Sequence, residues 1–202
     1  MDPFTGETAV DGPRVTLEGR SANPVRNPSG YFVFLDIEPG TVTVLVDGGS
    51  KFLDERVTGV TTVDITDPAT TVDPADPTTF PVETVELTPS PAYPFPSGTT
   101  LIRGRVLDPA SEPIPEATVE IRNHGAGTRT DGNGEYVVVI DPVSAANVTT
   151  VDDRRVFEVN DAAPELGVND PNGGTKTITL DDDGGDSIVE IGTLTVHDVT
   201  MS

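Results

Sequence analysis

Several kinds of chemistry are excluded by residues that the chain lacks. It has no cysteine, so disulfides and thiolate chemistry are impossible and the redox compartment cannot be read from the sequence. It has no tryptophan and only three tyrosines, which disfavours an aromatic platform for sugars. No apolar run approaches the ~20 residues that span a bilayer. The first ten residues, MDPFTGETAV, lack the basic and apolar regions of a secretory signal, so none is expected.

Basic residues are also scarce. Lysine and arginine total 12 against 34 aspartates and glutamates, which gives a net charge of -22, and Lys51 and Lys176 are the only lysines. Because phosphate binding needs a basic surface, a direct nucleic-acid partner is not expected. The acidity fits disorder, a cation-seeking surface or adaptation to high salt. The β-branched content opposes disorder, and the even spread of acids favours salt adaptation.

What the chain does contain is apolar alternation with a period of two residues, the signature of β-strands. No useful 3.6-residue period appears. In the first half the alternation predicts a strand at 14–20, a hairpin formed by 31–37 and 41–46, a weaker strand at 53–63 and a closing strand at 82–87. The acidic Pro/Thr segment 66–79 is expected to be an irregular loop.

The second half alternates more clearly. Strands are predicted at 101–107, 117–122, 135–140 and 154–159, with a hairpin that pairs 175–180 with 187–196. Asp131-Gly132-Asn133-Gly134 is a strong tight-turn signal, because these residues tolerate positive φ. Segments 141–153 and 160–174 are expected to be loops.

Four prolines in Pro89–Gly98 predict an extended, stiff linker. We therefore expect a domain at 1–88, a linker at 89–98 and a second domain at 99–202 that carries acidic loop insertions. Tyr93 and Phe95 are interface candidates, because their rings could anchor the linker between the domains.

The stretch 101–140 carries a recognisable order of motifs. Gly104-Arg105-Val106 is followed by Pro113-Ile114-Pro115, and Thr128–Asp131 leads into Gly132–Tyr136. This order resembles the carboxypeptidase regulatory-like domain, a prealbumin-like or Cna-B-type β-sandwich, over roughly residues 99–196. The first half is similar to a divergent second copy of the domain, through Gly30–Leu35 and Pro39–Val44, with Val42 where the family usually has tyrosine.

The predicted fold is therefore all-β, with two tandem antiparallel Ig-like or prealbumin-like sandwiches joined by the proline-rich linker. Apolar residues on the inward face of the predicted strands should form the cores. They are Val15, Leu17, Val33, Leu35, Val44, Val85, Ile102, Val106, Val119, Ile121, Val137, Val139, Ile178, Val189 and Ile191.

Catalytic patterns are missing. The resemblance brings zinc carboxypeptidases to mind, but neither His124 nor His197 is followed by a glutamate at the spacing of a His-x-x-Glu motif. No Gly-x-Ser-x-Gly stands at a strand–helix junction. We expect no enzyme activity and no catalytic residue.

The acidic turn at Asp181, Asp182, Asp183 and Asp186 is a candidate calcium site, because hard cations prefer carboxylate oxygens. It matches no known calcium-loop spacing, and a solvated loop is the favoured reading. No other cofactor is expected.

The function that this pattern favours is a non-enzymatic structural or adaptor protein of a large assembly, such as a phage-like tail, a contractile injection particle or a virion surface, from a halophile. Such sandwiches serve many functions, so this step is analogy at the level of fold. The partners would be other protein subunits, with homo-oligomerisation open. The chain would be made in the cytoplasm and built into a particle. The alternative is an adhesion or carbohydrate-binding module at the cell surface.

Overall fold

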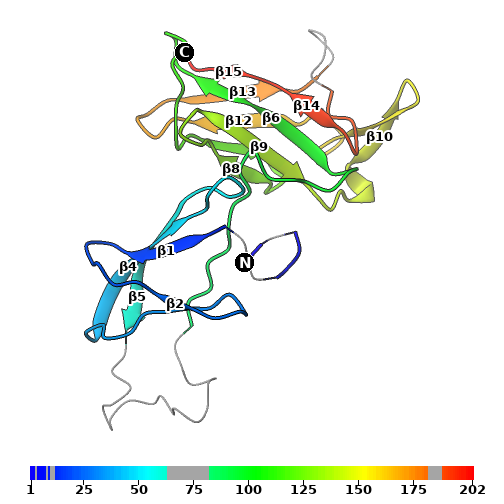
Figure 1. Cartoon of the computed structure of the whole chain (residues 1–202). Coiled ribbons are helices and arrows are strands. Elements are labelled where there is room, and N and C mark those ends of the chain that lie inside the picture. The colour runs from blue at the N-terminus through cyan, green and yellow to red at the C-terminus, as the bar shows by residue number, and fades with distance from the viewer. Residues whose placement is uncertain (3, 8, 10–11, 63–81, 182–187) are drawn as a thin grey trace. The chain divides into compact units, whose positions relative to one another are not determined.

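The structure is a computed structural model that describes residues 1–2, 4–7, 9, 12–62, 82–181 and 188–202. The chain divides into two compact units, Met1–Ala92 and Tyr93–Ser202, and each is described by itself (Figure 1). The described residues form strands and one single-turn 3₁₀ helix, Ala145–Asn147, with no α-helix. They include no helix that is long and apolar enough to cross a membrane. The all-β prediction is confirmed.

The first unit is built on a three-stranded antiparallel sheet in the order β1-β4-β5. Its strands are β1 (Arg14–Leu17), β4 (Gly40–Asp47) and β5 (Glu55–Thr62). A separate ribbon pairs β2 (Val25–Arg26) with β3 (Phe32–Val33). Alternation buries Val15 and Leu17, as predicted, and the buried set is completed by Val46, Phe52, Leu53 and Leu87.

The predicted hairpin of 31–37 with 41–46 is wrong. Strand β4 pairs instead with β1 on one side and β5 on the other, so both of its edges are occupied. After Val33 the chain leaves strand geometry, and Asp36 takes a left-handed φ of 57°. Val33 and Leu35, expected in the core, are 46% and 62% exposed. Alternation marked a strand-like segment there, but it could not choose the partner of β4.

The closing strand predicted at 82–87 is also absent from the structure. The segment contributes buried Leu87, and Phe52 makes a single bridge to Pro89 beyond it. Val44 and Val85, predicted as core, are only partly buried.

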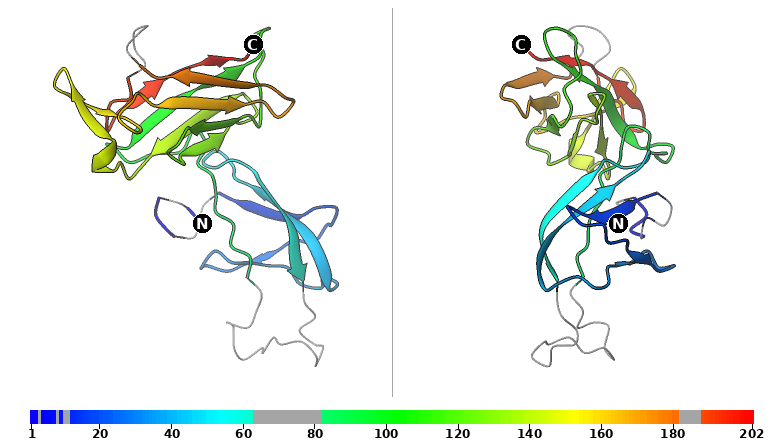
Figure 2. Two further views of the ribbon diagram at one scale, coloured as in Figure 1. Left: turned by 180° about the vertical axis from the view of Figure 1, so that it is seen from behind. Right: turned by 60° about the vertical axis from the view of Figure 1, so that its left-hand side comes forward.

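The second unit is a β-sandwich of two four-stranded sheets, drawn from further directions in Figure 2. One sheet has the order β13-β12-β7-β8, and in the other β6 pairs with β9, β14 and β15. The first sheet comprises β7 (Thr118–Ile121), β8 (Gly127–Arg129), β12 (Glu165–Asn169) and β13 (Thr175–Thr179). The second comprises β6 (Thr100–Leu107), β9 (Glu135–Ile140), β14 (Leu194–Val196) and β15 (Val199–Thr200).

The tight turn before β9 is confirmed in detail. The Asp131 carboxylate accepts hydrogen bonds from the amides of Asn133 at 2.8 Å and Glu135 at 2.9 Å. Gly134 has a φ of +70°, and a Cβ there would lie 2.8 Å from the Val106 carbonyl oxygen. Glycine is therefore required both by the backbone and by the neighbouring strand.

Two of the predicted loops contain strands. Segment 160–174 holds β12, which pairs with both β7 and β13 in the interior of its sheet. Segment 141–153 holds β10 (Val148–Val151), which forms a hairpin with β11 (Arg154–Phe157). In Figure 2 this hairpin projects beyond the sheets of its own unit. Short strands with few apolar residues give little alternation to detect.

The predicted pairing of 175–180 with 187–196 is wrong as well. Strand β13 pairs with β12, whereas β14 and β15 pair with β6 in parallel. The second sheet is therefore mixed, where an antiparallel one was predicted. A parallel partner needs a long crossover, so local sequence carries no signal for it.

The core of the second unit lies between its two sheets. It contains five of the predicted positions: Ile102, Val106, Val119, Ile121 and Val189. Two more, Ile178 and Ile191, are partly buried and pack against it. On β9 the inward residues are Tyr136, Val138 and Ile140. Val137 is buried on the opposite face and Val139 is partly buried there, so the predicted face of β9 was wrong.

The proline-rich segment is held at both ends. In the first unit, the Ser90 hydroxyl donates to the Ser50 carbonyl at 2.6 Å and the Ser90 amide to the Lys51 carbonyl at 2.9 Å. In the second unit, the Tyr93 and Phe95 rings lie 4.9 Å apart, and the Arg103 guanidinium lies 5.4 Å from the Phe95 ring. Part of the segment is thus packed onto each unit.

A close backbone approach attaches the last strands to β6. A Cβ at Gly104 would lie 1.8 Å from the His197 carbonyl oxygen. The buried Tyr136 hydroxyl donates to that oxygen at 2.6 Å, and the Arg105 amide donates to the Asp198 carboxylate at 2.8 Å. We call these four groups, centred on Gly104, the Gly104 contact. It fixes the bend between β14 and β15.

We predict that Gly104→Ala destabilises the chain by about 2–4 kcal/mol, because the added methyl must displace His197 and break the Tyr136 hydrogen bond. Urea unfolding measures the loss. Gly132→Ala is the matched control, because a Cβ there meets nothing within 4 Å. Equal stability of the two variants would contradict the Gly104 contact.

Burial, with a smaller contribution from the Asp198 charge, raises the pKa of the Tyr136 hydroxyl above its ordinary value. The unfolded chain ionises this tyrosine near pH 10, while the folded chain keeps its proton. The contribution of Tyr136 to the free energy of unfolding is therefore fully present below about pH 10 and is lost as the pH rises above it.

We predict that Tyr136→Phe abolishes the part of this alkaline loss that Tyr136 causes. Urea unfolding at pH 8, 10 and 11 gives the comparison, with Tyr31→Phe, at an exposed position, as the control. If Tyr136→Phe and the unmodified chain lose the same free energy between pH 8 and 11, the assignment is wrong.

Candidate functional site

The calcium prediction falls mostly outside the described residues. Asp182, Asp183 and Asp186 lie there, and Asp181 alone of the four is described. Elsewhere in the described chain, no group of three His, Cys, Asp or Glu side chains is arranged to hold a metal. In the loop between β12 and β13, the Asp170 carboxylate accepts a hydrogen bond from the Asn172 amide at 2.7 Å and so closes its own turn.

The two histidines have structural surroundings. The His124 ring packs edge-on against Phe157 at 4.9 Å, and its Nδ1 is buried without a hydrogen-bond partner. His197 contributes its carbonyl to the Gly104 contact. His124 follows β7 and His197 follows β14, so they belong to different sheets.

The candidate interface residues Tyr93 and Phe95 contact each other, and Phe95 also contacts Arg103. Tyr93 is buried and Phe95 is partly buried. Their proposed anchoring of one domain to the other stays a prediction.

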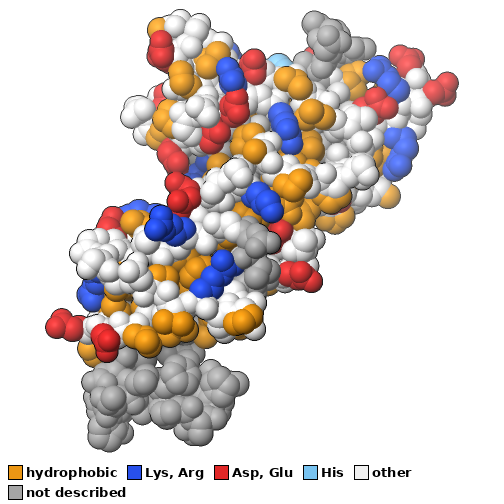
Figure 3. All heavy atoms as spheres, viewed as in Figure 1, with side chains coloured by type: hydrophobic (Ala, Val, Ile, Leu, Met, Phe, Trp, Pro, Cys, Tyr) orange, Lys and Arg blue, Asp and Glu red, His pale blue; other side chains and the backbone are white. Residues whose placement is uncertain are grey.

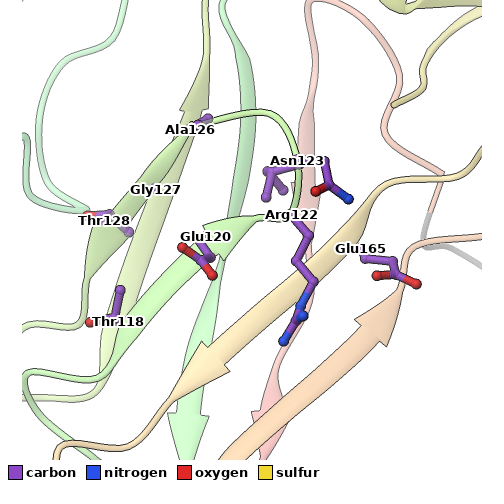
Figure 4. Close-up of a pocket in the computed structure, with 10 residues that line it drawn as sticks. Thr118, Glu120, Arg122, Asn123, Ala126, Gly127, Thr128 and Glu165 are labelled. Carbon is purple, nitrogen blue, oxygen red and sulfur yellow. The ribbon is translucent and has the colours of Figure 1, made fainter. Parts of the chain in front are cut away.

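A polar hollow of about 400 Å³ lies on the sheet formed by β8, β7 and β12, near the β7–β8 turn (Figure 4). The charged side chains at its wall are Glu120 and Arg122, with Glu165 on β12. Thr118, Asn123 and Thr128 add polar groups. All three charged residues are exposed. Sequence analysis did not predict this site.

Glu120, at the wall of the hollow, has a glycine beside it on each neighbouring strand. Its cross-strand partners are Gly127 on β8 and Gly167 on β12. A cross-strand neighbour normally covers a side chain on the surface of a sheet. Here neither strand supplies one, so the backbone of Gly127 is exposed, while Gly167 is buried beneath the side chains of Arg122 and Glu120.

Arg122 uses the space above Gly167. A Cβ at Gly167 would lie 3.0 Å from the Arg122 Nε and 3.5 Å from the Glu120 Cγ, so both side chains converge over this glycine. Figure 4 shows Arg122 extending from the end of β7 across β12, between Glu120 and Glu165 in this view. The backbone amide of Arg122 donates to the Glu165 carbonyl at 2.9 Å and holds the strand ends together.

The charged side chains of the hollow form no ion pairs within the described part of the chain. Among the described residues, no side-chain hydrogen bond or ion pair involves Glu120, Arg122 or Glu165. Two other arginines of this unit are paired: Arg129 lies 2.8 Å from Glu116, and the hydrogen bond and charge of Glu135 raise the pKa of Arg105. Exposed single pairs stabilise a fold little, so unpaired charges here cost the fold little.

The chemistry available in the hollow is recognition. A guanidinium offers planar donors that match a carboxylate, and a carboxylate accepts from a cation or an amide. The residues that line it include no histidine, serine or cysteine that could act as a nucleophile with a base beside it. The arrangement therefore supports binding of a polar or charged partner group.

On the face seen in Figure 3, acidic and basic side chains lie scattered among apolar and neutral ones. In the hollow, two opposite charges that form no ion pair with any described residue, those of Glu120 and Arg122, lie close together over the backbone of Gly167.

Comparison with known proteins identifies part of the second unit. Residues 101–152 match the family of the carboxypeptidase regulatory-like domain, a β-sandwich family, which confirms the resemblance predicted for this stretch. The match contains β6, β7, β8 and β9, and with them Glu120, Arg122 and Gly127 of the hollow. The divergent copy in the first half stays a prediction.

Other comparisons add little. No curated protein matches the chain. Among solved structures, the Bacillus anthracis TIE protein is similar at 12% identity and a TM-score of 0.28, over 96% of this chain and 32% of that one. The chain thus spans about a third of the length of that protein.

Proposed function

We propose that the chain is a non-enzymatic structural or adaptor subunit of a large protein assembly, such as a phage-like tail, a contractile injection particle or a virion surface. The observation that carries the proposal is the polar hollow on a regular sheet face, which offers unpaired charges for recognition and no reactive group. A β-sandwich of the regulatory-like family fits a structural or surface protein.

The construction of the second unit supports this role. Both sheets are closed on one core, and the Gly104 contact fixes the last strands on β6. Lys176 on β13 donates to the Thr200 carbonyl on β15 at 2.6 Å, which links the two sheets at their edges. A unit fixed in this way presents its outer side chains in constant positions, as docking between subunits requires.

The predicted partners are other protein subunits, and the predicted route is synthesis in the cytoplasm followed by incorporation into a particle. The acidic surface would suit an organism that works at high salt, where ions screen repulsion between carboxylates.

Imaging of native particles tests the assembly directly. Particles are purified from the source organism by density gradient, imaged in negative stain and analysed by mass spectrometry for peptides of this chain. We expect the chain to co-purify with particles at a fixed ratio to their other subunits. Recovery only in the cell-envelope fraction would overturn the proposal and favour the surface adhesion or carbohydrate-binding alternative.

Salt adaptation gives a second prediction. The Debye length grows from ~3 Å at 1 M salt to ~10 Å at 0.1 M, so repulsion among the surplus carboxylates should lower stability as salt is removed. We expect the midpoint of thermal unfolding to fall steeply between 2 M and ~0.1 M NaCl.

A matched variant separates charge from other salt effects. The adjacent residues Asp152 and Asp153 are exposed, and both have a left-handed backbone conformation, with φ of 47° and 63°. Asparagine tolerates this conformation as well as aspartate does. The double change Asp152→Asn, Asp153→Asn should stabilise the chain more at 0.1 M than at 2 M. A midpoint that does not depend on salt would refute salt adaptation.

A further inference from the structure

We propose that the sheet face around the hollow docks a second copy of this chain, through reciprocal ion pairs between Glu120 and Arg122. We call this surface the Glu120 face and define it as Thr118, Glu120, Arg122, Gly127, Gly167 and Thr177. The inference deepens the proposed assembly role by naming a partner, and it rests on that role.

The first argument is charge complementarity. Glu120 lies on β7 and Arg122 directly follows that strand, and both side chains reach over Gly167 on the same side of the sheet. A two-fold axis in the contact plane, crossing β7 between these residues, places Glu120 of each copy opposite Arg122 of the other. An isologous contact needs such a self-complementary patch. Neither side chain has a partner within its own chain that would have to be given up.

The second argument is shape. Gly127, Glu120, Gly167 and Thr177 stand in one row across β8, β7, β12 and β13. Two of these four positions have no side chain, and Thr177 has a small one. Facing sheets usually lie about 10 Å apart because side chains fill the space. The space above Gly167 is occupied by Arg122 and Glu120 of the same chain, whereas Gly127 is exposed. The open position at Gly127 lets a long charged side chain from a second copy reach Glu120 and Arg122.

The third argument concerns the net charge of -22. Two copies repel one another at long range, and at ~0.1 M salt this repulsion extends over about 10 Å. At 1 M salt the range falls to about 3 Å, which is close to the length of an ion-pair contact. Salt therefore removes most of the repulsion while contact pairs across the Glu120 face persist. Self-association should accordingly increase with salt.

Sedimentation equilibrium of the full chain at 0.1 M and 2 M NaCl tests the docking, with four variants. We expect the unmodified chain to form dimers at 2 M. Glu120→Arg and Arg122→Glu each place like charges opposite one another, so each should weaken association by more than about tenfold. The double variant Glu120→Arg, Arg122→Glu restores opposite charges in every facing pair and should restore the dimer.

Arg154→Glu is the matched control, because Arg154 is an exposed arginine on the β10–β11 hairpin, off the Glu120 face. Arg154→Glu makes the same charge change as Arg122→Glu and should leave the dimer intact. Thermal unfolding of each variant checks that it is folded. These side chains are exposed, so folding should be retained.

Three results would overturn the docking: a monomer at both salt concentrations, single variants that associate as the unmodified chain does, or a double variant that stays monomeric. Each leaves the assembly hypothesis standing, because that hypothesis is tested on native particles. Conversely, a chain that is absent from particles but dimerises through this face would refute the assembly role alone.

Discussion

The second unit depends on one close approach, that of the Gly104 backbone to the carbonyl of His197. Strand β6 lies between β9 on one side and β14 and β15 on the other, so its bonds hold the whole sheet together. A side chain at position 104 would keep the last strands away. The Tyr136 hydroxyl would then lose its acceptor, and the core would lose the buried side chains of Val199 and Met201. The absence of one methyl group thus permits the closure of the core.

Sequence reasoning succeeded where the structure is local. From 101 to 140, consecutive strands are joined by turns whose residues specify their own geometry, as at Asp131–Gly134, and the strands there were predicted closely. It failed where a strand had to choose among distant partners. Tyr31–Ile37 alternates well, yet β1 and β5 occupy both edges of β4. Strand β12 was missed because Glu165–Asn169 is short, includes a glycine and follows a turn-rich segment.

The hollow could not be predicted for a related reason. Glu120 and Arg122 look like ordinary solvent-facing residues of an amphipathic strand. Gly127 and Gly167 lie about forty residues apart and look like turn or loop glycines. Only the register of β8, β7 and β12 places both glycines beside Glu120. The register is set by burial of Val119, Ile121, Leu166 and Val168 on the opposite face. The core thus determines the geometry of a surface site to which it contributes no side chain.

The same reasoning connects the acidity to the sites where this protein can bind. A chain with 34 acidic and 12 basic residues has too few cations to neutralise its surface, so the position of each arginine matters. Three arginines form ion pairs within their own unit: Arg56, Arg105 and Arg129. Arg122 is held over glycine backbone, beside a carboxylate that it does not pair with. At high salt, where long-range repulsion is weak, contacts between subunits are decided by such short-range pairs, and therefore by the few arginines that the fold leaves available.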